Sequence, residues 1–453
     1  MLKGQGIRGG MIGAAALLLA ATGTLAQPPA PPDNAPVWRA ELASLGIDPA
    51  TMRKGADGNN PNAPNAANYD ETKVRAYTLP SLLGPTPPKN AAQWAKRRAE
   101  LVRLVEDNFI GRPSADIARV KVDWTVIKTE AKDVGSIPAV VKTIRGATSL
   151  DGRKGPVIEA EITAPAKPAG KMPAVIDYTF VFPANFFRRA ADAGPPPPPP
   201  PSPAVAALKR GWAYIAYYPY SVQADNGAGL KEGIIGLADG GKTRMPTEWG
   251  ALRAWGWGAS RVADYLQADP AIDGKRLAVA GLSRFGKSTL VATAFDDRFG
   301  AALVGSSGAG GAKLLRRNMG ELVENLEADG EFHWFAPNFL RYAGPKTVDD
   351  LPVDSHMLIA LVAPRPLFIG TGVREAGDGW VDPRGNYLAA VAATPAWQLF
   401  GKTGPTDPTQ PAVDVGVTGT TLSFRQHSGG HTNVPNWEPF LDWADKAWGR
   451  SAK

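Results

Sequence analysis

Residues 277–290 read LAVAGLSRFGKSTL and place a serine between an apolar run and a helix-like segment. The run 277–280 is typical of a buried parallel strand. Gly281 and Gly286 flank Ser283, and glycine permits the sharp turn that a strand-to-helix connection needs here. This order predicts a nucleophile elbow, in which the next helix points its N-terminus at the serine. The usual pattern is G-x-S-x-G, and here the second glycine comes one position later. An ordinary serine in a βα turn is the alternative.

The composition describes a large globular protein without thiol chemistry. The chain has 453 residues, of which 44% are hydrophobic and 21% charged, and this suits roughly one to three domains with a sizeable core. It contains no cysteine, which excludes disulfides, thiolate nucleophiles and thiolate metal ligands. The net charge of +7 comes from scattered basic residues. We therefore expect no nucleic-acid partner, and a mild positive field instead suits an anionic substrate.

Residues 1–26 have the features of a signal peptide. Lys3 and Arg8 give a positive start, residues 11–21 are apolar, and the last three residues read Thr-Leu-Ala, a small-x-small cleavage site. The apolar run is too short for a comfortable membrane span, although a membrane anchor is the alternative. We expect cleavage after Ala26, no stable membrane span, and an exported protein that is periplasmic or secreted.

Proline marks two further parts of the chain. Residues 27–70 are rich in Pro, Asn, Ala and Asp, so we expect extended or loop structure there and ordered structure from Tyr77 onward. We assign residues 71–453 to a single catalytic domain. Within it, residues 195–201 form an unbroken proline run inside an insertion at about residues 188–206. This run favours polyproline II and a stiff surface insertion.

Apolar runs and amphipathic segments alternate from about residue 156 onward. Compact apolar runs predict buried strands, and apolar residues at helical spacing between charges predict helices. The alternation predicts an α/β-hydrolase three-layer sandwich with a mostly parallel central sheet and right-handed crossovers. The predicted strands are 120–131, 156–163, 174–178, 212–217, 277–280, 301–305, 366–370 and 397–400, and the predicted helices are 90–109, 249–268, 383–393 and 436–448.

Four histidines are candidates for the base that a serine nucleophile needs. In α/β hydrolases the base follows both the serine and the acid in chain order, which favours a histidine near the C-terminus. His431 lies in a Gly-Gly-His-Thr loop just before the last predicted helix. We predict that His431 is the base, and His427 is its competitor.

The acid that orients the histidine should come from the loop after one of the later strands. Residues 371–382 form such a loop and offer Glu375, Asp378 and Asp382. Asp382 directly precedes a proline at a helix start, so a helix N-cap is the better interpretation of it. Glu375 and Asp378 both stay open as the carboxylate that would hold the imidazole in one tautomer.

Two cations follow Ser283 in the predicted elbow. The backbone N–H of Arg284 is the expected oxyanion donor, and its guanidinium can add to it. Lys287 lies one helical turn from the serine and can donate to sugar hydroxyls. Cations at a helix start oppose the helix dipole, so a solvated helix start explains them poorly. They suit a substrate with anionic or polyhydroxylated groups.

Taken together, these residues resemble the glucuronoyl esterases, carbohydrate esterase family 15. Residues 281–287 read GLSRFGK and are similar to the family's G-x-S-R-x-G-K, whose arginine and lysine are not general hydrolase features. The resemblance covers roughly residues 75–448. Further matching stretches are EWGALRAW at 248–255, SGAGG at 307–311, HWF at 333–335, APRP at 363–366, D-x-W-x-D-P at 378–383 and GH at 430–431.

The resemblance implies a substrate and residue roles. It implies hydrolysis of esters between 4-O-methyl-glucuronic acid on xylan and lignin alcohols, by a Ser–His–acid mechanism with an acyl-enzyme and without a metal or cofactor. By position, Ser283 would be the nucleophile, His431 the base, and Arg284 the oxyanion stabiliser. The residues that match those holding the glucuronate ring are Lys287, Glu321 and Trp380. Taken alone, the last two read as a surface helix residue and a core residue.

The chain departs from the family pattern at two positions. Many fungal members place the acid just before the S-G-x-G-G segment, where this chain has Ser306, and a hydroxyl cannot do that job. The acid must then come from the later loop, as in some bacterial relatives, and Asp378 is preferred to Glu375. Leu282 replaces a cysteine that many members carry, so their nearby disulfide is absent.

Two other functions remain as alternatives. The first is an acetyl xylan esterase or another small carbohydrate ester esterase on the same scaffold, although Arg284 and Lys287 argue against it. The second is an inactive xylan-binding homologue, which loss of the usual acid position favours and the presence of Ser283 and His431 disfavours. We expect a monomer whose partner is a glucuronoxylan or lignin–carbohydrate ester.

Overall fold

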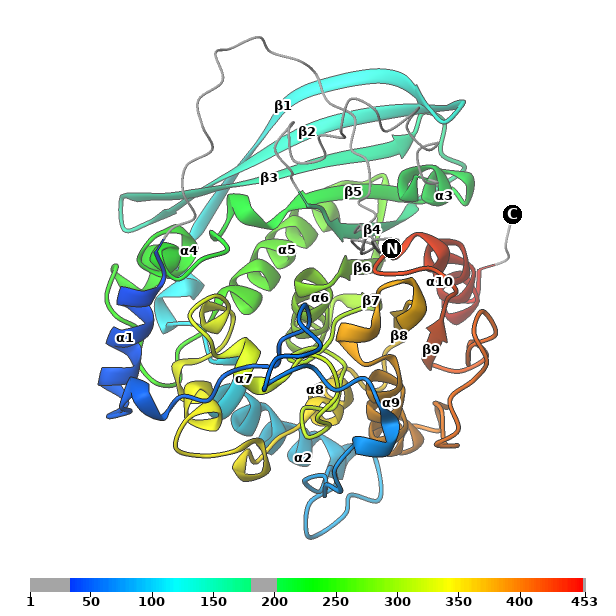
Figure 1. The fold of residues 1–453 in the computed structure, drawn as a ribbon. Helices are drawn as coiled ribbons and strands as arrows, with labels where there is room; N and C mark the ends of the chain where they lie inside the picture. The colour runs from blue at the N-terminus through cyan, green and yellow to red at the C-terminus, as the bar shows by residue number, and fades with distance from the viewer. Residues whose placement is uncertain (1–32, 181–201, 451–453) are drawn as a thin grey trace, which may run out of the picture.

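A nine-stranded sheet with helices packed on it forms the centre of the computed structural model, which describes residues 33–180 and 202–450 (Figure 1). The strand order is β1-β2-β3-β5-β4-β6-β7-β8-β9. The predicted signal peptide and the proline run lie outside the described residues.

The strands are β1 (Lys121–Val134), β2 (Ile137–Leu150), β3 (Arg153–Pro165), β4 (Met172–Tyr178), β5 (Ala213–Tyr218), β6 (Ile272–Leu282), β7 (Phe299–Gly305), β8 (Leu367–Thr371) and β9 (Leu422–Gln426). The α-helices are α1 (Ala35–Ser44), α2 (Ala91–Val105), α3 (Pro203–Lys209), α4 (Gly233–Asp239), α5 (Ala251–Ala268), α6 (Arg284–Phe295), α7 (Val323–Leu326), α8 (Ser355–Ala360), α9 (Pro383–Gln398) and α10 (Val434–Ala447).

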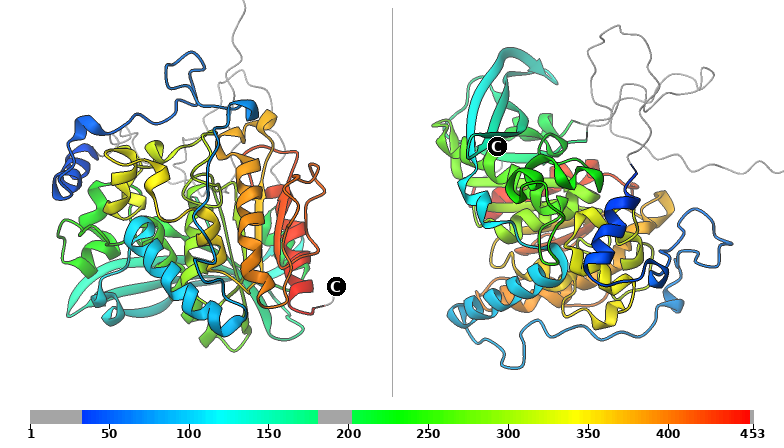
Figure 2. Two further views of the ribbon diagram at one scale, coloured as in Figure 1. Left: turned by 90° about the horizontal axis from the view of Figure 1, so that it is seen from below. Right: turned by 90° about the vertical axis from the view of Figure 1, so that its left-hand side faces the viewer.

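Ordered structure begins well before Tyr77, contrary to the prediction. Helix α1 falls inside the segment that we expected to be extended, and it is fixed by the buried ion pair between Glu41 and Arg244, 2.8 Å long. A partner 203 residues away leaves no trace in local composition. Residues 53–75, here called the N-terminal strap, continue from α1 along the outside of the molecule toward the start of α9 (Figure 2).

The strands from β4 to β9 are parallel, and β4, β7, β8 and residues 277–281 of β6 are buried on both faces. In β6, Leu277 and Val279 belong to the main core, which includes α5, α6, α8 and α9. Their neighbours Ala278 and Ala280 pack in a second cluster with α3 and α10. Successive strand residues point to opposite faces, so a strand covered on both sides reads as a continuous apolar run. The predicted three-layer α/β sandwich with a mostly parallel sheet is confirmed.

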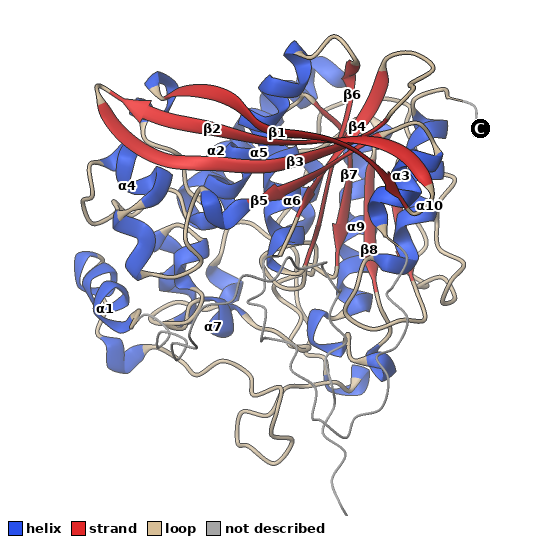
Figure 3. Cartoon of the chain, turned by 90° about the horizontal axis from the view of Figure 1, so that it is seen from above, coloured by secondary structure: helices blue, strands red, loops and turns tan. Residues whose placement is uncertain are grey.

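Strands β1 to β3 form an antiparallel extension that is strongly twisted relative to β7 and β8 (Figure 3). Strand β3 pairs antiparallel with β5 and so joins the extension to the parallel half. The prediction included parts of β1 and β3 but missed β2. Several buried positions of β2 are small or polar, among them Ala139, Gly146 and Thr148, so the apolar alternation that marks a half-buried strand is weak.

The predicted strand 397–400 is wrong. These residues are the end of α9 and the turn after it, and the last strand is β9. Pro395 lies inside α9, at a position where proline usually ends a helix. The helix continues because Trp397 is fully buried and its indole N–H donates to the Arg365 carbonyl at 3.1 Å.

Candidate active site

The turn after β6 holds Ser283 in a strained backbone conformation. Its φ is 60° and its ψ is −129°, a region that residues with a Cβ rarely occupy. A Cβ at Gly281 would lie 2.4 Å from the Phe285 carbonyl oxygen, and one at Gly286 would lie 2.5 Å from the Gly305 carbonyl oxygen. Both glycines are therefore needed for β6 and α6 to meet at this angle, as the sequence predicted. Ser283 precedes the first residue of α6, where backbone N–H groups have no helical partner.

A buried carboxylate holds the His431 ring. Nδ1 of His431 lies 2.7 Å from Oδ1 of Asp378, whose side chain is 0% exposed. The other oxygen, Oδ2, accepts hydrogen bonds from the Ser306 hydroxyl at 2.7 Å and from the Gly372 N–H at 2.5 Å. Asp378 is thus fixed by two neutral donors while it contacts the imidazole. Ser306 does not replace an acid here, but it positions one, which the sequence analysis did not foresee.

Two hydrogen bonds hold the serine turn, and the second joins it to the histidine loop. The Ser283 N–H donates to the Gly305 carbonyl at 2.9 Å, which fixes the turn against the end of β7. The side-chain amide of Asn433 donates to the Gly281 carbonyl at 3.0 Å. Asn433 comes two residues after His431, and Gly281 comes two residues before Ser283. The structure thus brings both loops to the carboxyl edge of the sheet. Within the described residues, the Ser283 hydroxyl makes no hydrogen bond to the His431 ring.

The competing residues have other partners. Glu375 is exposed, and among the described residues it makes no hydrogen bond or ion pair with His431. His427 lies buried, its Nε2 2.8 Å from the Thr432 carbonyl oxygen, so it braces the loop that carries His431. Burial lowers the pKa of His427. Asp382 accepts a hydrogen bond from the Gly385 N–H at 2.9 Å, which confirms it as the N-cap of α9.

Arg284 is anchored by a carboxylate that the sequence analysis missed. Its Nη1 lies 2.5 Å from Oδ2 of Asp225, which also accepts from Tyr220 Oη at 3.0 Å. The second oxygen of Asp225 contacts His333 Nε2 at 3.0 Å and Trp334 Nε1 at 2.6 Å. Burial acts to raise the pKa of Asp225, but the His333 hydrogen bond and the Arg284 charge outweigh it and hold the pKa below its usual range. The Arg284 guanidinium carbon also lies 5.3 Å from the Trp334 ring centroid.

Lys287 and Glu321 form a buried ion pair. Nζ of Lys287 lies 2.9 Å from Oε2 of Glu321, and their side chains are 4% and 5% exposed. Nζ also donates to the Ser307 carbonyl at 2.8 Å, and the Ala309 N–H donates to the same Glu321 oxygen at 2.8 Å. Glu321 is therefore not a surface helix residue, and Lys287 does not lie on a solvated helix start. Each charge offsets the cost of burying the other.

Solved structures with this architecture include several glucuronoyl esterases. One of carbohydrate esterase family 15 from Teredinibacter turnerae is 39% identical to this chain with a TM-score of 0.84, and the match covers 92% of this chain and 100% of that one. The chain belongs to this family. A glucuronoyl esterase from Solibacter usitatus is 31% identical with a TM-score of 0.73, covering 84% of this chain and 100% of the other.

In sequence, fungal members of the glucuronoyl esterase family match a shorter part of the chain. The family profile described as "Glucuronyl esterase, fungi" matches residues 203–401. The 4-O-methyl-glucuronoyl methylesterase of Hypocrea jecorina is 39% identical over 160 residues, and this match covers 34% of each protein. The chain thus spans about a third of that fungal relative, whereas it covers the whole of the two bacterial structures.

Glu331 and Trp380 lie around the Lys287–Glu321 ion pair in this glucuronoyl esterase family member. Burial raises the pKa of Glu331 to about 7, the negative Glu321 adds to the rise, and Lys287 and Arg284 oppose it. The sequence did not indicate Glu331, because the charged groups that act on it come from other segments of the chain. Trp380, half-buried rather than core, lies next to the strap, and its carbonyl accepts from the Glu321 N–H at 2.9 Å.

The described residues, 33–180 and 202–450, contain neither a metal-binding cluster nor a membrane-spanning helix. In these ranges no group of three or more His, Cys, Asp or Glu side chains is arranged to hold a metal ion. The same ranges contain no helix that is both long and apolar enough to cross a bilayer.

Proposed function

We propose that this member of the glucuronoyl esterase family hydrolyses esters of glucuronic acid and its 4-O-methyl ether, as in the cross-links between xylan and lignin. The Hypocrea jecorina relative is named for this ester class, and the bacterial relatives are named glucuronoyl esterases. The observation that carries the proposal is the 2.7 Å contact between His431 and buried Asp378 on a loop that is fastened to the Ser283 turn.

In the proposed mechanism, Ser283 is the nucleophile. His431 takes the hydroxyl proton as Oγ attacks the ester carbonyl, and Asp378 stabilises the imidazolium that forms. The backbone N–H of Arg284 and its guanidinium stabilise the negative oxygen of the tetrahedral intermediate. His431 then gives its proton to the leaving alcohol, and the acyl-enzyme forms. Water, activated by the same histidine, attacks the acyl-enzyme and releases the uronic acid.

Asp225 supports this role of Arg284 without touching the substrate. A guanidinium on a flexible side chain loses rotamer entropy when it is held in place for the reaction. The carboxylate of Asp225 already fixes one edge of the Arg284 guanidinium, so less ordering is left for the reaction itself. Preorganised donors of this kind stabilise developing charge most effectively.

In this proposal, Lys287, Glu321 and Trp380 bind the uronic acid ring. The ion pair of the first two gives a donor and an acceptor whose positions are fixed by neighbouring backbone groups, as sugar hydroxyls require. The Trp380 ring gives an apolar face of the kind on which sugar rings pack. Glu375 has no role in this scheme.

The test is a comparison of two esters with matched variants. The wild-type protein should turn over the methyl ester of 4-O-methyl-glucuronic acid and prefer it to 4-nitrophenyl acetate, and Ser283→Ala should abolish this turnover while the circular dichroism spectrum stays unchanged. Preference for the acetate would make the protein an acetyl esterase. Xylan binding without turnover of either ester would make it an inactive homologue.

We further propose that the mature protein begins at Gln27, is exported, and acts as a monomer with one catalytic domain at residues 71–453. The positive start, apolar run and small residues of 1–26 support export. The intact mass of the protein recovered outside the cytoplasm tests the cleavage position, and sedimentation velocity tests the monomer. A mass that includes residues 1–26 would contradict the processing.

A further inference from the structure

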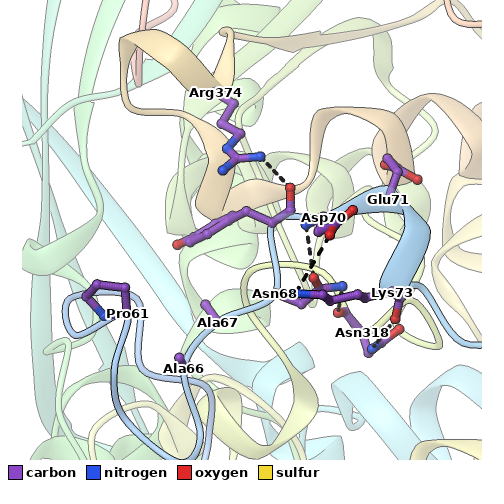
Figure 4. Close-up of a pocket in the computed structure, with 10 residues that line it drawn as sticks. Pro61, Ala66, Ala67, Asn68, Asp70, Glu71, Lys73, Asn318 and Arg374 are labelled. Atoms are coloured by element: carbon purple, nitrogen blue, oxygen red, sulfur yellow. Dashed lines mark hydrogen bonds and ion pairs between the residues drawn. The ribbon is translucent and has the colours of Figure 1, made fainter.

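A groove of about 890 Å³ is lined in part by Arg374, which lies in the loop that carries Asp378 (Figure 4). One part of its lining comes from the N-terminal strap, including Asn68, Tyr69 and Lys73, and another comes from Asn318 and Arg374. Arg374 is only four residues before Asp378. The groove is therefore built between the strap and the proposed catalytic loop, and the mechanism above does not use it.

The strap is held rigidly where it forms the groove. The Asn68 amide donates to the Asn318 carbonyl at 3.0 Å, and the Gly320 N–H donates to the Asn68 carbonyl at 2.9 Å. The guanidinium of Arg374 donates to the Tyr69 carbonyl. These bonds tie the strap both to the segment that carries Glu321 and to the loop that carries Asp378. The groove is thus formed before any ligand arrives, which lowers the entropy cost of binding.

The Tyr69 ring joins this groove to the proposed uronic acid site. The Arg374 guanidinium carbon lies 5.1 Å from the Tyr69 ring centroid. A Cβ at Gly58 would lie 2.8 Å from the Trp380 ring and 3.3 Å from Tyr69 Oη, and a Cβ at Gly379 would lie 3.4 Å from the Tyr69 ring. Tyr69 is therefore a close neighbour of Trp380. A ligand that extends past Trp380 meets the Tyr69 ring next.

The charges around the groove balance one another. Asp70 pairs with Lys73 at 3.7 Å, and Glu71 pairs with Arg317 at 2.8 Å, outside the groove. Arg374 gives one remaining cation, which lies over the Tyr69 ring. A strongly charged ligand finds no excess of opposite charge here. An aromatic ring, amide side chains and a guanidinium instead match a neutral ligand with many hydroxyl groups.

We propose that this groove binds the neutral sugar chain that carries the esterified glucuronate. The inference rests on the proposed function, and it adds a second binding site that lies beyond the uronic acid ring. The chain would pack a sugar face on Tyr69 and receive hydrogen bonds from Arg374 and Asn68. Substrates with a xylan chain then bind more tightly than the bare uronate ester, while the chemical step is the same for both.

The experiment compares the methyl ester of 4-O-methyl-glucuronic acid alone with the same ester carried on a xylo-oligosaccharide. Tyr69→Ala should raise KM for the oligosaccharide ester about three- to tenfold, the range expected from loss of an aromatic contact. It should leave kcat for both esters, and KM for the small ester, unchanged. Tyr69→Phe keeps the ring and should stay close to wild type.

Tyr77→Ala is the matched control, because Tyr77 is half-buried just beyond the strap but does not line the groove. It should not change the ratio of the two KM values. An equal rise in KM for both esters in Tyr69→Ala, or no rise for either, would overturn the groove site. The benzyl ester of 4-O-methyl-glucuronic acid is measured as a third substrate. A rise in its KM in Tyr69→Ala, with no change for either methyl ester, would assign the groove to the alcohol instead.

A binding measurement separates this inference from the proposed function. A neutral xylo-oligosaccharide without uronic acid is titrated into Ser283→Ala and into the Ser283→Ala, Tyr69→Ala double variant. Binding that weakens at least threefold in the double variant supports the groove even if the wild-type protein turns over neither ester. Equal binding to both variants would contradict the groove even if the esterase activity is as proposed.

Discussion

Asp225 and Asp378 are two carboxylates near the carboxyl edge of the sheet, the first largely and the second fully buried, and they hold different kinds of group. Asp225 binds a permanent cation, Arg284, with three further donors around it. Asp378 binds the His431 ring and is itself fixed by a hydroxyl and a backbone N–H. The first carboxylate keeps a charge in place. The second orients a ring whose charge must change during the reaction.

The difference teaches where each carboxylate acts in the proposed reaction. The charge of Arg284 is always present, so Asp225 changes only how well the guanidinium is positioned. The imidazolium appears only after proton transfer, so Asp378 stabilises a state that exists near the transition state. Loss of the second carboxylate should therefore cost far more in kcat than loss of the first.

The largest effect is expected from Asp378→Asn. An amide in place of the carboxylate presents an N–H group or a weak acceptor to the ring, so the imidazole loses its required tautomer. We expect kcat for the methyl glucuronate ester to fall on the order of 10⁴-fold, with KM changed little. Glu375→Gln, in the same loop, is the control and should behave as wild type. A large loss with Glu375→Gln and a small one with Asp378→Asn would reverse the assignment.

A smaller loss is expected on the Arg284 side. Arg284→Ala should lower kcat on the order of 10²- to 10³-fold, as removal of one oxyanion donor does elsewhere. Asp225→Asn should lower it about tenfold, because the guanidinium stays but is less well positioned. In an Arg284→Ala background, Asp225→Asn should change kcat by less than about twofold. A full tenfold loss in that background would show that Asp225 acts independently of Arg284.

Ser306→Ala should have the next smaller effect. It removes one of two donors to Oδ2 of Asp378 and leaves the Gly372 N–H in place. A hydrogen bond to a charged group contributes about 1.5–3 kcal/mol, and part of this is restored by the remaining donor or by water. We expect kcat to fall about tenfold, which corresponds to about 1.4 kcal/mol. A loss as large as that of Asp378→Asn would mean that Ser306 is itself part of the catalytic machinery.

The smallest effect concerns Asp177, a carboxylate for which one hydrogen-bond donor is identified among the described residues. It is the residue before the last in β4 and accepts a hydrogen bond from Tyr214 Oη at 2.6 Å. Burial raises the pKa of Asp177 to about 7 from 3.8, and the Tyr214 hydrogen bond only partly opposes this. Since the folded state keeps the proton longer than the unfolded state, the free energy of unfolding falls as pH rises from about 4 to about 7 and is level above.

Asp177→Asn should remove this decline, at most about 1.4 kcal/mol per pH unit. Urea unfolding at several pH values between 4 and 8 measures it. The curves for wild type and variant should separate as pH rises through this window and run parallel above it. Curves that stay parallel from pH 4 onward would show that Asp177 is ionised throughout.

The parts of the fold that depend on residues close together in the sequence were predictable. The Ser283 turn follows from an apolar run and two glycines within ten residues, and the parallel half of the sheet follows from its continuous apolar strands. Contacts across long distances were not predictable. Asp225 lies 59 residues before Arg284, and its role exists only because the fold brings them together.

Small and polar residues account for most of the remaining errors. Strand β2 lacked a strong apolar pattern, and α9 continues past Pro395, although proline usually ends a helix. The sequence left Glu375 and Asp378 as the two candidates for the acid. In the structure, Asp378 is the one that contacts the His431 imidazole. Ser306 could be identified as a departure from the fungal pattern, but its hydrogen bond to Asp378 joins two loops 72 residues apart.

The pairing of β7 with β8 has a consequence for how such enzymes can diverge. Gly305 and Gly370 are partners in the ladder, so the residues that leave the two strands, Ser306 and Gly372, both reach the same Asp378 oxygen. A carboxylate supplied from either strand end would stand beside the same imidazole. During evolution the acid can therefore move from one loop to the other while the histidine stays where it is, provided that both loops carry an acid for some interval.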